Sequence, residues 1–159
     1  IAQVELFPYQ SPKGSDVKEL ALEALEQLEK DPTPWTSPED HLIPSQIPMF
    51  DYLVAVLSQV RSEIDSKASE RTVVIARGSA AKTAMFRQAV LKAGGDGVSD
   101  LKKSVYQLSG QNSSLTLKNL KSLDGEKVIK AGKPSKEDYQ RAANELLGSN
   151  AVQLNGKAS

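Results

Sequence analysis

The stretch Thr72–Lys92, TVVIARGSAAKTAMFRQAVLK, decides the fold that this sequence predicts. Its first five residues form a short β-branched run, which is typical of a buried strand. From Ala80 to Ala93 the chain is rich in alanine and repeats its apolar residues at helical spacing, and Gly94-Gly95 ends the pattern. Only Arg77-Gly78-Ser79 separates strand from helix, so the stretch predicts a βα unit with a very short turn.

The turn of this unit carries groups that bind anions. The free backbone N–H groups and the dipole at a helix start attract negative charge, Gly78 permits close backbone approach, Ser79 can cap or donate, and Arg77 offers a planar fork for phosphate. Further cations follow along the helix and beyond it. The candidate polyanion-binding residues are therefore Arg77, Gly78, Ser79, Lys82, Arg87, Lys102 and Lys103.

A structural explanation of the same residues stays open. Short βα turns are common in α/β domains, so Gly78 can serve the turn alone while the cations only solvate a helix. In addition, Lys82 and Arg87 lie roughly 140° apart around an ideal helix. That angle argues against a single phosphate track along it.

Two helices and a proline-rich strap are predicted before this unit. Apolar residues recur at helical spacing from Met49 to Ile64, and again, with acids between them, from Ser15 or Asp16 until Pro32. Residues 31–48 hold five prolines around the only tryptophan, which predicts an extended strap or linker. Trp35 is expected either to plug an apolar gap on its own domain or to bind a partner, and His41 to be a polar loop residue.

Beyond Asp96 the apolar period shortens and predicts a hairpin, with Val105–Leu108 and Leu115–Leu120 as strands around a turn at residues 109–113. Lys127–Lys130 is a candidate further strand. Pro134-Ser135 is expected to start a last helix that ends at Gly148.

These elements predict an α+β fold. A small sheet, with the βα unit and a C-terminal β-hairpin, is packed by two long helices, and an N-terminal and a C-terminal helix are added to it. Residues 1–46 form the acidic N-terminal helix and the Pro/Trp-rich strap, residues 47–148 the α+β core domain, and residues 149–159 a mobile tail.

Composition excludes much of the common enzyme chemistry. The 159 residues include no cysteine and a single histidine, which removes disulfides, thiolate metal sites, thiol catalysis and any mechanism that needs two imidazoles. The segment Gly78–Thr83 lacks the glycine that a nucleotide-binding loop places before its lysine, and no carboxylate pair stands out for acid–base work. We therefore expect no catalytic residues, no metal and no cofactor, and a protein that is not an enzyme.

The longest apolar run, Leu53–Leu57, is five residues, so no membrane-spanning segment is expected. The chain starts at Ile1, which suggests a processed or trimmed start, and the compartment stays open.

Charge is unevenly distributed along a chain whose 20 basic and 20 acidic residues cancel. Residues 1–46 carry three basic and nine acidic residues (−6), residues 47–131 thirteen and eight (+5), and residues 132–159 four and three (+1). A basic block in a neutral chain can mark an anionic partner, or the acidic front can fold back onto it.

Residues 42–92 partly resemble the Alba-type nucleic-acid-binding proteins. The resemblance lies in LIPSQIPMFDYL (Leu42–Leu53), in the long helix that follows, and in VIARGSA (Val74–Ala80). It implies that Ser45 and Gln46, Arg77 and Gly78, and a hairpin arm at residues 107–116 face nucleic acid. The loop at Ser45 lacks the lysines of that family, and the acidic and C-terminal helices have no counterpart in its small core.

Two classes of function follow. The first is a non-catalytic binding module that contacts DNA, RNA or another polyanion through the basic βα turn and the hairpin. The second is a structural or assembly subunit, a homo-oligomer or part of a larger complex, held by its N-terminal arm, strap and tail. The sequence pI of 6.8 favours the second class, because strong nucleic-acid binders usually have a domain pI above about 9.

Overall fold

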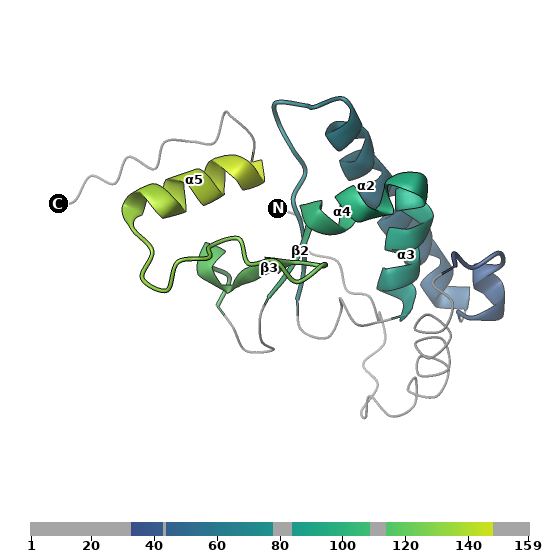
Figure 1. Cartoon of the computed structure of the whole chain (residues 1–159). Coiled ribbons are helices and arrows are strands. Elements are labelled where there is room, and N and C mark those ends of the chain that lie inside the picture. Colours follow the sequence, from purple (N-terminus) through teal and green to yellow (C-terminus); the bar gives the residue numbers. More distant parts are fainter. Residues whose placement is uncertain (1–32, 43, 78–83, 109–113, 148–159) are drawn as a thin grey trace.

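The computed structural model describes residues 33–42, 44–77, 84–108 and 114–147 (Figure 1). The predicted acidic helix, the turn residues Gly78, Ser79 and Lys82, the predicted hairpin turn and the tail lie outside these residues. Within them the chain has the α+β architecture that the sequence predicted. Its helices and strands are α2 (Ile47–Asp65), β1 (Val74–Ala76), α3 (Ala84–Gly94), α4 (Val98–Ser104), β2 (Val105–Leu108), β3 (Leu120–Ser122) and α5 (Lys136–Leu147).

The three strands form one mixed sheet in the order β1-β2-β3. β1 and β2 run parallel, with Val74 opposite Val105, and β2 and β3 run antiparallel, with Leu108 opposite Leu120. β1 and β2 therefore finish at the same end of the sheet, where β3 begins. We call this the carboxyl end and the opposite one the amino end.

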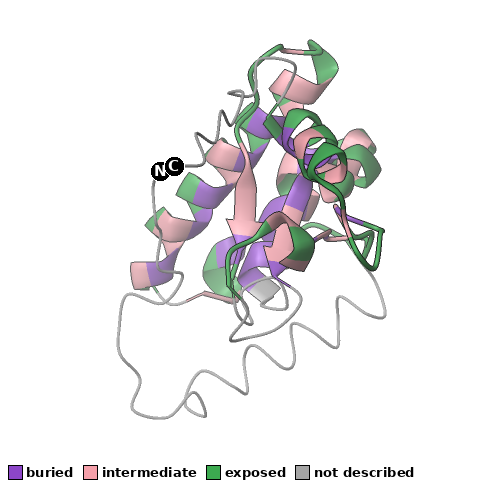
Figure 2. Ribbon diagram, turned by 90° about the vertical axis from the view of Figure 1, so that its left-hand side faces the viewer, coloured by how far each residue is buried: buried purple, intermediate pink, exposed green. Residues whose placement is uncertain are grey.

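Helices cover both faces of the sheet (Figures 1 and 2). One core cluster joins Phe50, Leu53, Leu57 and Val60 of α2 to buried residues of α3, α4 and the strands. A second cluster joins Leu108 and Leu120 to Leu146 of α5. The sheet thus lies between α5 on one side and the other three helices on the opposite side.

The two long helices follow their predicted patterns closely. α2 has its proline in the first turn, where the missing N–H costs nothing, and its i, i+3, i+4 repeat faces the core. Tyr52 belongs to the predicted stripe but is 46% exposed, so the stripe is narrower than expected. α3 ends at Gly94, as predicted, because Gly95 adopts a φ of +47°, a conformation that glycine accepts without strain.

The chain between α3 and α5 departs from the prediction in three places. Residues 98–104 form α4, a short helix whose few apolar residues give too little periodicity to detect. Leu115–Leu120 is not a continuous strand, because Leu117–Asn119 forms a 3-10 turn and Leu115 is 64% exposed. The predicted strand Lys127–Lys130 is reduced to one bridge, in which Lys127 pairs with Lys121.

The C-terminal helix begins where the sequence placed its start. The Asp138 N–H donates to Ser135 Oγ (3.2 Å), and the Ser135 N–H donates to Asp138 Oδ2 (2.9 Å), which is a reciprocal capping box. These bonds, the backbone one first, hold the pKa of the Asp138 carboxyl below its usual value. α5 then buries Ala142, Ala143 and Leu146, and Leu146 packs with Leu108 and Leu120 of the sheet.

Candidate functional site

Arg77 follows β1 directly and is exposed at the carboxyl end of the sheet. In Figure 1 this is the lower end of the sheet. The backbone around Arg77 is ordered by the pairing of Ala76 with Gln107 on β2. Of the predicted turn, Arg77 is thus the one residue whose position the structure describes.

Lys102 and Lys103 lie at the other end of the sheet. They belong to the last turn of α4 and precede β2, whose first residue lies opposite Val74, the first residue of β1. At about 3.3 Å per strand residue, Val105 lies roughly 7 Å along β2 from the row that contains Ala76, and Lys103 lies beyond Val105 in the last turn of α4. Lys103 also pairs with Asp100 (Nζ–Oδ1 3.8 Å). The structure therefore does not bring these two lysines together with Arg77.

Arg87 does not join Arg77 in an exposed cluster either. It is half-buried on α3, and its neighbours Met85, Phe86, Gln88 and Ala89 are buried. Most of the surface of α3 is thus used for packing, which a periodicity argument alone did not reveal.

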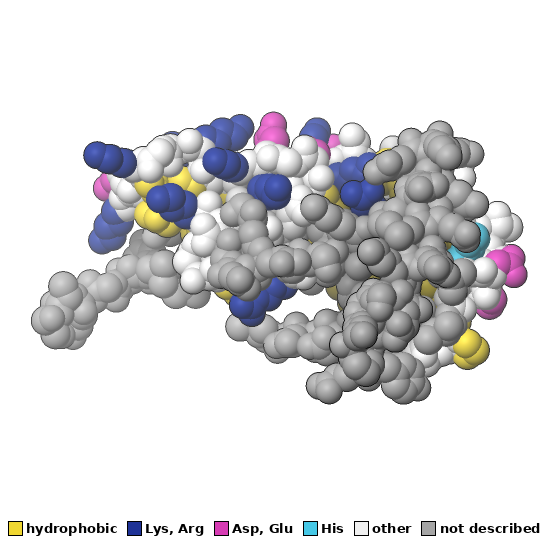
Figure 3. Space-filling view, turned by 90° about the horizontal axis from the view of Figure 1, so that it is seen from below, with side chains coloured by type: hydrophobic (Ala, Val, Ile, Leu, Met, Phe, Trp, Pro, Cys, Tyr) yellow, Lys and Arg dark blue, Asp and Glu magenta, His cyan; other side chains and the backbone are white. Residues whose placement is uncertain are grey.

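A larger group of cations surrounds the carboxyl end near β3, and the sequence analysis did not single it out. Residues 114–136 carry six lysines against two acids, Asp124 and Glu126. Within the described part of the chain only Lys130 of these lysines has a carboxylate partner, Glu126 (Nζ–Oε2 3.6 Å). Figure 3 views the molecule from the carboxyl end and shows Lys and Arg side chains gathered on the side that holds β3 and the segment leading to α5. The six lysines are Lys118, Lys121, Lys127, Lys130, Lys133 and Lys136.

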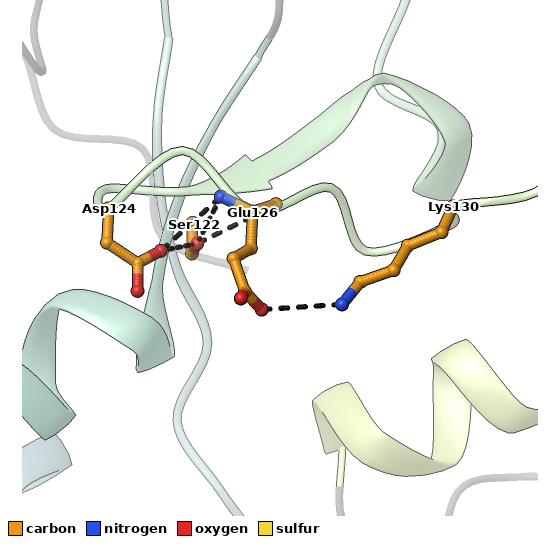
Figure 4. Close-up of polar contacts among 4 residues, drawn as sticks. All are labelled: Ser122, Asp124, Glu126 and Lys130. Carbon is orange, nitrogen blue, oxygen red and sulfur yellow. Dashed lines mark hydrogen bonds and ion pairs between the residues drawn. The ribbon is translucent and has the colours of Figure 1, made fainter.

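A hydrogen-bonded turn after β3 holds part of this group in place (Figure 4). Ser122 Oγ donates to Asp124 Oδ1 and accepts from the Glu126 N–H (3.1 Å). The Ser122 N–H donates to the Glu126 carbonyl (2.8 Å), and Gly125 takes a φ of +97°, which only glycine adopts freely. The turn folds residues 126–128 back beside β3.

The amino end of the sheet is tied together by polar contacts. The Thr72 N–H and Oγ1 donate to the two Glu63 oxygens (2.5 and 2.9 Å). Slight burial pulls the pKa of Glu63 upward, but bonds from Thr72 and Gln59, with Arg71 nearby, outweigh it and lower this pKa. Burial raises the pKa of Tyr106 on the neighbouring strand. The cavity between these residues is about 10 Å³, room for one water at most.

Trp35 packs on its own domain. Its backbone N–H donates to Gln88 Oε1 (2.7 Å), and Gln88 Nε2 donates to the Thr33 carbonyl (3.0 Å). Its ring stacks on His41 (centroids 4.6 Å apart, planes 16° apart) and lies 6.0 Å from the Phe50 ring. The strap is therefore fastened to α2 and α3, and His41 serves it as a stacking partner.

Within the described ranges, no three His, Asp or Glu side chains come together in a way that could hold a metal ion. No helix in those ranges is both long and apolar enough to cross a membrane. Comparison with known proteins gives no match for this chain, whether with models of protein families, with curated proteins or with solved structures.

Proposed function

We propose that this protein is a non-catalytic binding module that holds the phosphate backbone of a nucleic acid at the carboxyl end of its sheet. The observation that carries the proposal is the strand register. It places Arg77, at the end of β1, near the start of β3, which Lys118 precedes, and it places Lys121 in the row of Gln107 and Ala76, next to that end. Cations from separate parts of the chain converge there, which is the arrangement that an extended polyanion requires.

The electrostatics of the core support this proposal. Residues 47–131 carry a net charge of +5 although the whole chain is neutral. Most of the cations at the carboxyl end are exposed, Lys121 is half-buried, and, Lys130 aside, they have no carboxylate partner in the described ranges. Unpaired charges remain available to a phosphate, whereas the charge of Lys103 at the amino end is partly neutralised by Asp100.

The resemblance to Alba-type proteins agrees with the proposal at Arg77, the described member of the Arg-Gly turn, but not at Gln46, which the resemblance places against nucleic acid and which is buried. Lys102 and Lys103 drop out of the proposed interface, because they lie at the amino end. Lys118, Lys121 and Lys127 enter it instead.

The test measures the affinity of the full chain for single-stranded RNA, single-stranded DNA and duplex DNA at several salt concentrations. Arg77→Ala should weaken binding by a similar factor for every sequence, since a phosphate contact carries no sequence information. The salt slope, which is the slope of log K against the logarithm of the salt concentration, should fall in magnitude by about 0.9 for duplex or about 0.7 for single strands. Lys103→Ala, at the amino end, is the matched control and should change neither quantity. Absence of binding at low salt to all three ligands would refute the proposal.

The alternative is a subunit of a protein assembly. Exposed apolar side chains favour it: Leu115 is 64% exposed, Tyr52 and Leu147 46% each, and Tyr139 38%. Trp35 already packs against its own chain, so these side chains rather than the strap would meet a protein partner. The native mass of the full chain, measured over a range of concentrations, tests this alternative.

A further inference from the structure

The bridge between Lys121 and Lys127 places two like charges directly side by side. A backbone hydrogen bond lies on each side of the bridge, one from the Ser122 N–H to the Glu126 carbonyl (2.8 Å) and one from the Val128 N–H to the Leu120 carbonyl (3.1 Å). This pattern defines a non-hydrogen-bonded pair, in which opposite Cα atoms are about 4.5 Å apart and the side chains lie closest. The two lysine stems therefore leave the same face of the sheet from adjacent positions.

Opposed like charges destabilise a sheet, and nothing in the described chain relieves this pair. Both acids of the intervening turn are engaged elsewhere, since Asp124 accepts from Ser122 and Glu126 pairs with Lys130. Neither Lys121 nor Lys127 has a carboxylate within ion-pair distance in the described ranges. An anion placed between the two ammonium groups would turn the repulsion into two attractions.

The backbone that carries Lys121 and Lys127 is ordered without a ligand. The bonds of Ser122 and the φ of Gly125 determine the turn, so an anion need not order the backbone in order to bind. Leu120 and Ser122, the neighbours of Lys121 on β3, are buried. Because side chains alternate along a strand, Lys121 points to the face opposite theirs, where Gln107 of β2 lies beside it.

From this geometry we infer that Lys121 and Lys127 together bind one phosphate group through its oxygens, and that the phosphate belongs to a nucleic-acid backbone. The site rests on the proposed function for the source of the phosphate. It is separate from Arg77, two strands away in the same sheet, and it needs none of the turn residues that follow Arg77.

The experiment compares wild type with Lys121→Gln, Lys127→Gln and the double variant K121Q/K127Q in the full chain. With single-stranded RNA at low salt, the double variant should bind about tenfold more weakly. Because one phosphate is shared, the double variant should lose a salt slope of about 0.7 in all, and neither single variant should lose more than that. Two separate phosphates would instead cost about 1.4 in the double variant, and that result would overturn the shared site. Lys103→Gln is the control and should bind as wild type.

A second measurement separates the site from the source of its phosphate. Pyrophosphate should raise the melting temperature of wild type and shift the amide resonances around residues 121–128, and K121Q/K127Q should lose both effects. If RNA binds wild type and K121Q/K127Q equally, the inference is wrong while the proposed function stands. If pyrophosphate acts as described but no nucleic acid binds, the proposed function and the nucleic-acid source are wrong, and the anion site stands.

Discussion

The two ends of the sheet use their charged residues in different ways. At the amino end charged side chains are bound within the fold: Glu63 accepts from Thr72, Lys103 pairs with Asp100, and Arg61 Nη1 donates to the Gly97 carbonyl (2.9 Å). At the carboxyl end Arg77 and the lysines around β3 other than Lys130 have no such carboxylate partners in the described part of the chain. At the first end Glu63 and Arg61 of α2 hold neighbouring segments in place, whereas the unpaired cations at the second end are those that we propose to meet a partner.

This difference shows why a count of cations along the sequence does not locate an interface. Lys102 and Lys103 are closer to Arg77 in sequence than Lys121 is, yet the parallel register of β1 and β2 separates them from it by the length of a strand. The antiparallel return of β3 brings Lys121 opposite Gln107, in the row of Ala76, the residue before Arg77.

The largest effect is expected when the carboxyl end loses its charge. Combining Arg77→Ala with K121Q/K127Q should weaken RNA binding about a hundredfold, because contacts about 10 Å apart add nearly independently. K102Q/K103Q removes as many lysines from the amino end and should change affinity less than about twofold. Anisotropy titrations at one salt concentration measure both affinities. Equal losses of RNA affinity from the two sets of substitutions would contradict the predicted difference between the two ends.

A smaller effect, on stability alone, is expected at the amino end. Glu63→Ala removes the acceptor of the Thr72 N–H and hydroxyl and should lower the free energy of unfolding by about 1 kcal/mol. RNA affinity should stay as in wild type. Urea unfolding measures the first quantity, and a loss of affinity in the folded variant would show that the two ends are not independent.

At the bridge, Lys127→Glu should act in opposite directions on stability and binding. It replaces a like-charge pair by an opposite-charge pair with Lys121, so the fold should gain about 0.5 kcal/mol. Binding of RNA should weaken, since the change also brings a negative charge to the proposed phosphate position. The prediction requires that the melting temperature rises while the affinity for RNA falls, both measured on one preparation.

The smallest effect is a pH dependence at the amino end. The pKa of Glu63 in the folded state lies below its ordinary value of 4.5, so the unfolded chain binds its proton first as pH falls. The stability that Glu63 contributes is complete above about pH 4.5 and is lost as pH falls through the folded pKa. Unfolding free energies of wild type and Glu63→Gln at pH 7 and in acid should therefore converge on acidification. A constant difference between them would contradict the assignment.

Local features of the sequence were enough to predict most of the helices and strands. The repeat from Met49 to Ile64 matches α2, Gly94-Gly95 ends α3, and Pro134-Ser135 precedes the capped start of α5. Each depends on side chains within one or two turns of one another, so periodicity and capping chemistry carry the information. α4 was missed because seven residues with two core contacts, Val98 and Leu101, hold too little of a period.

The sequence by itself determined most of the elements, the α+β class and the basic charge of residues 47–131. Only the tertiary structure decided that Lys121 lies in the row of Ala76, the residue before Arg77, that Lys127 stands opposite Lys121, and that Trp35 meets Gln88. The physical reason is that strand register and direction follow from how both faces of the sheet are buried at once, under α2 and α3 on one side and α5 on the other. A one-residue slip would leave every local pattern intact and move each of these charges to the other face.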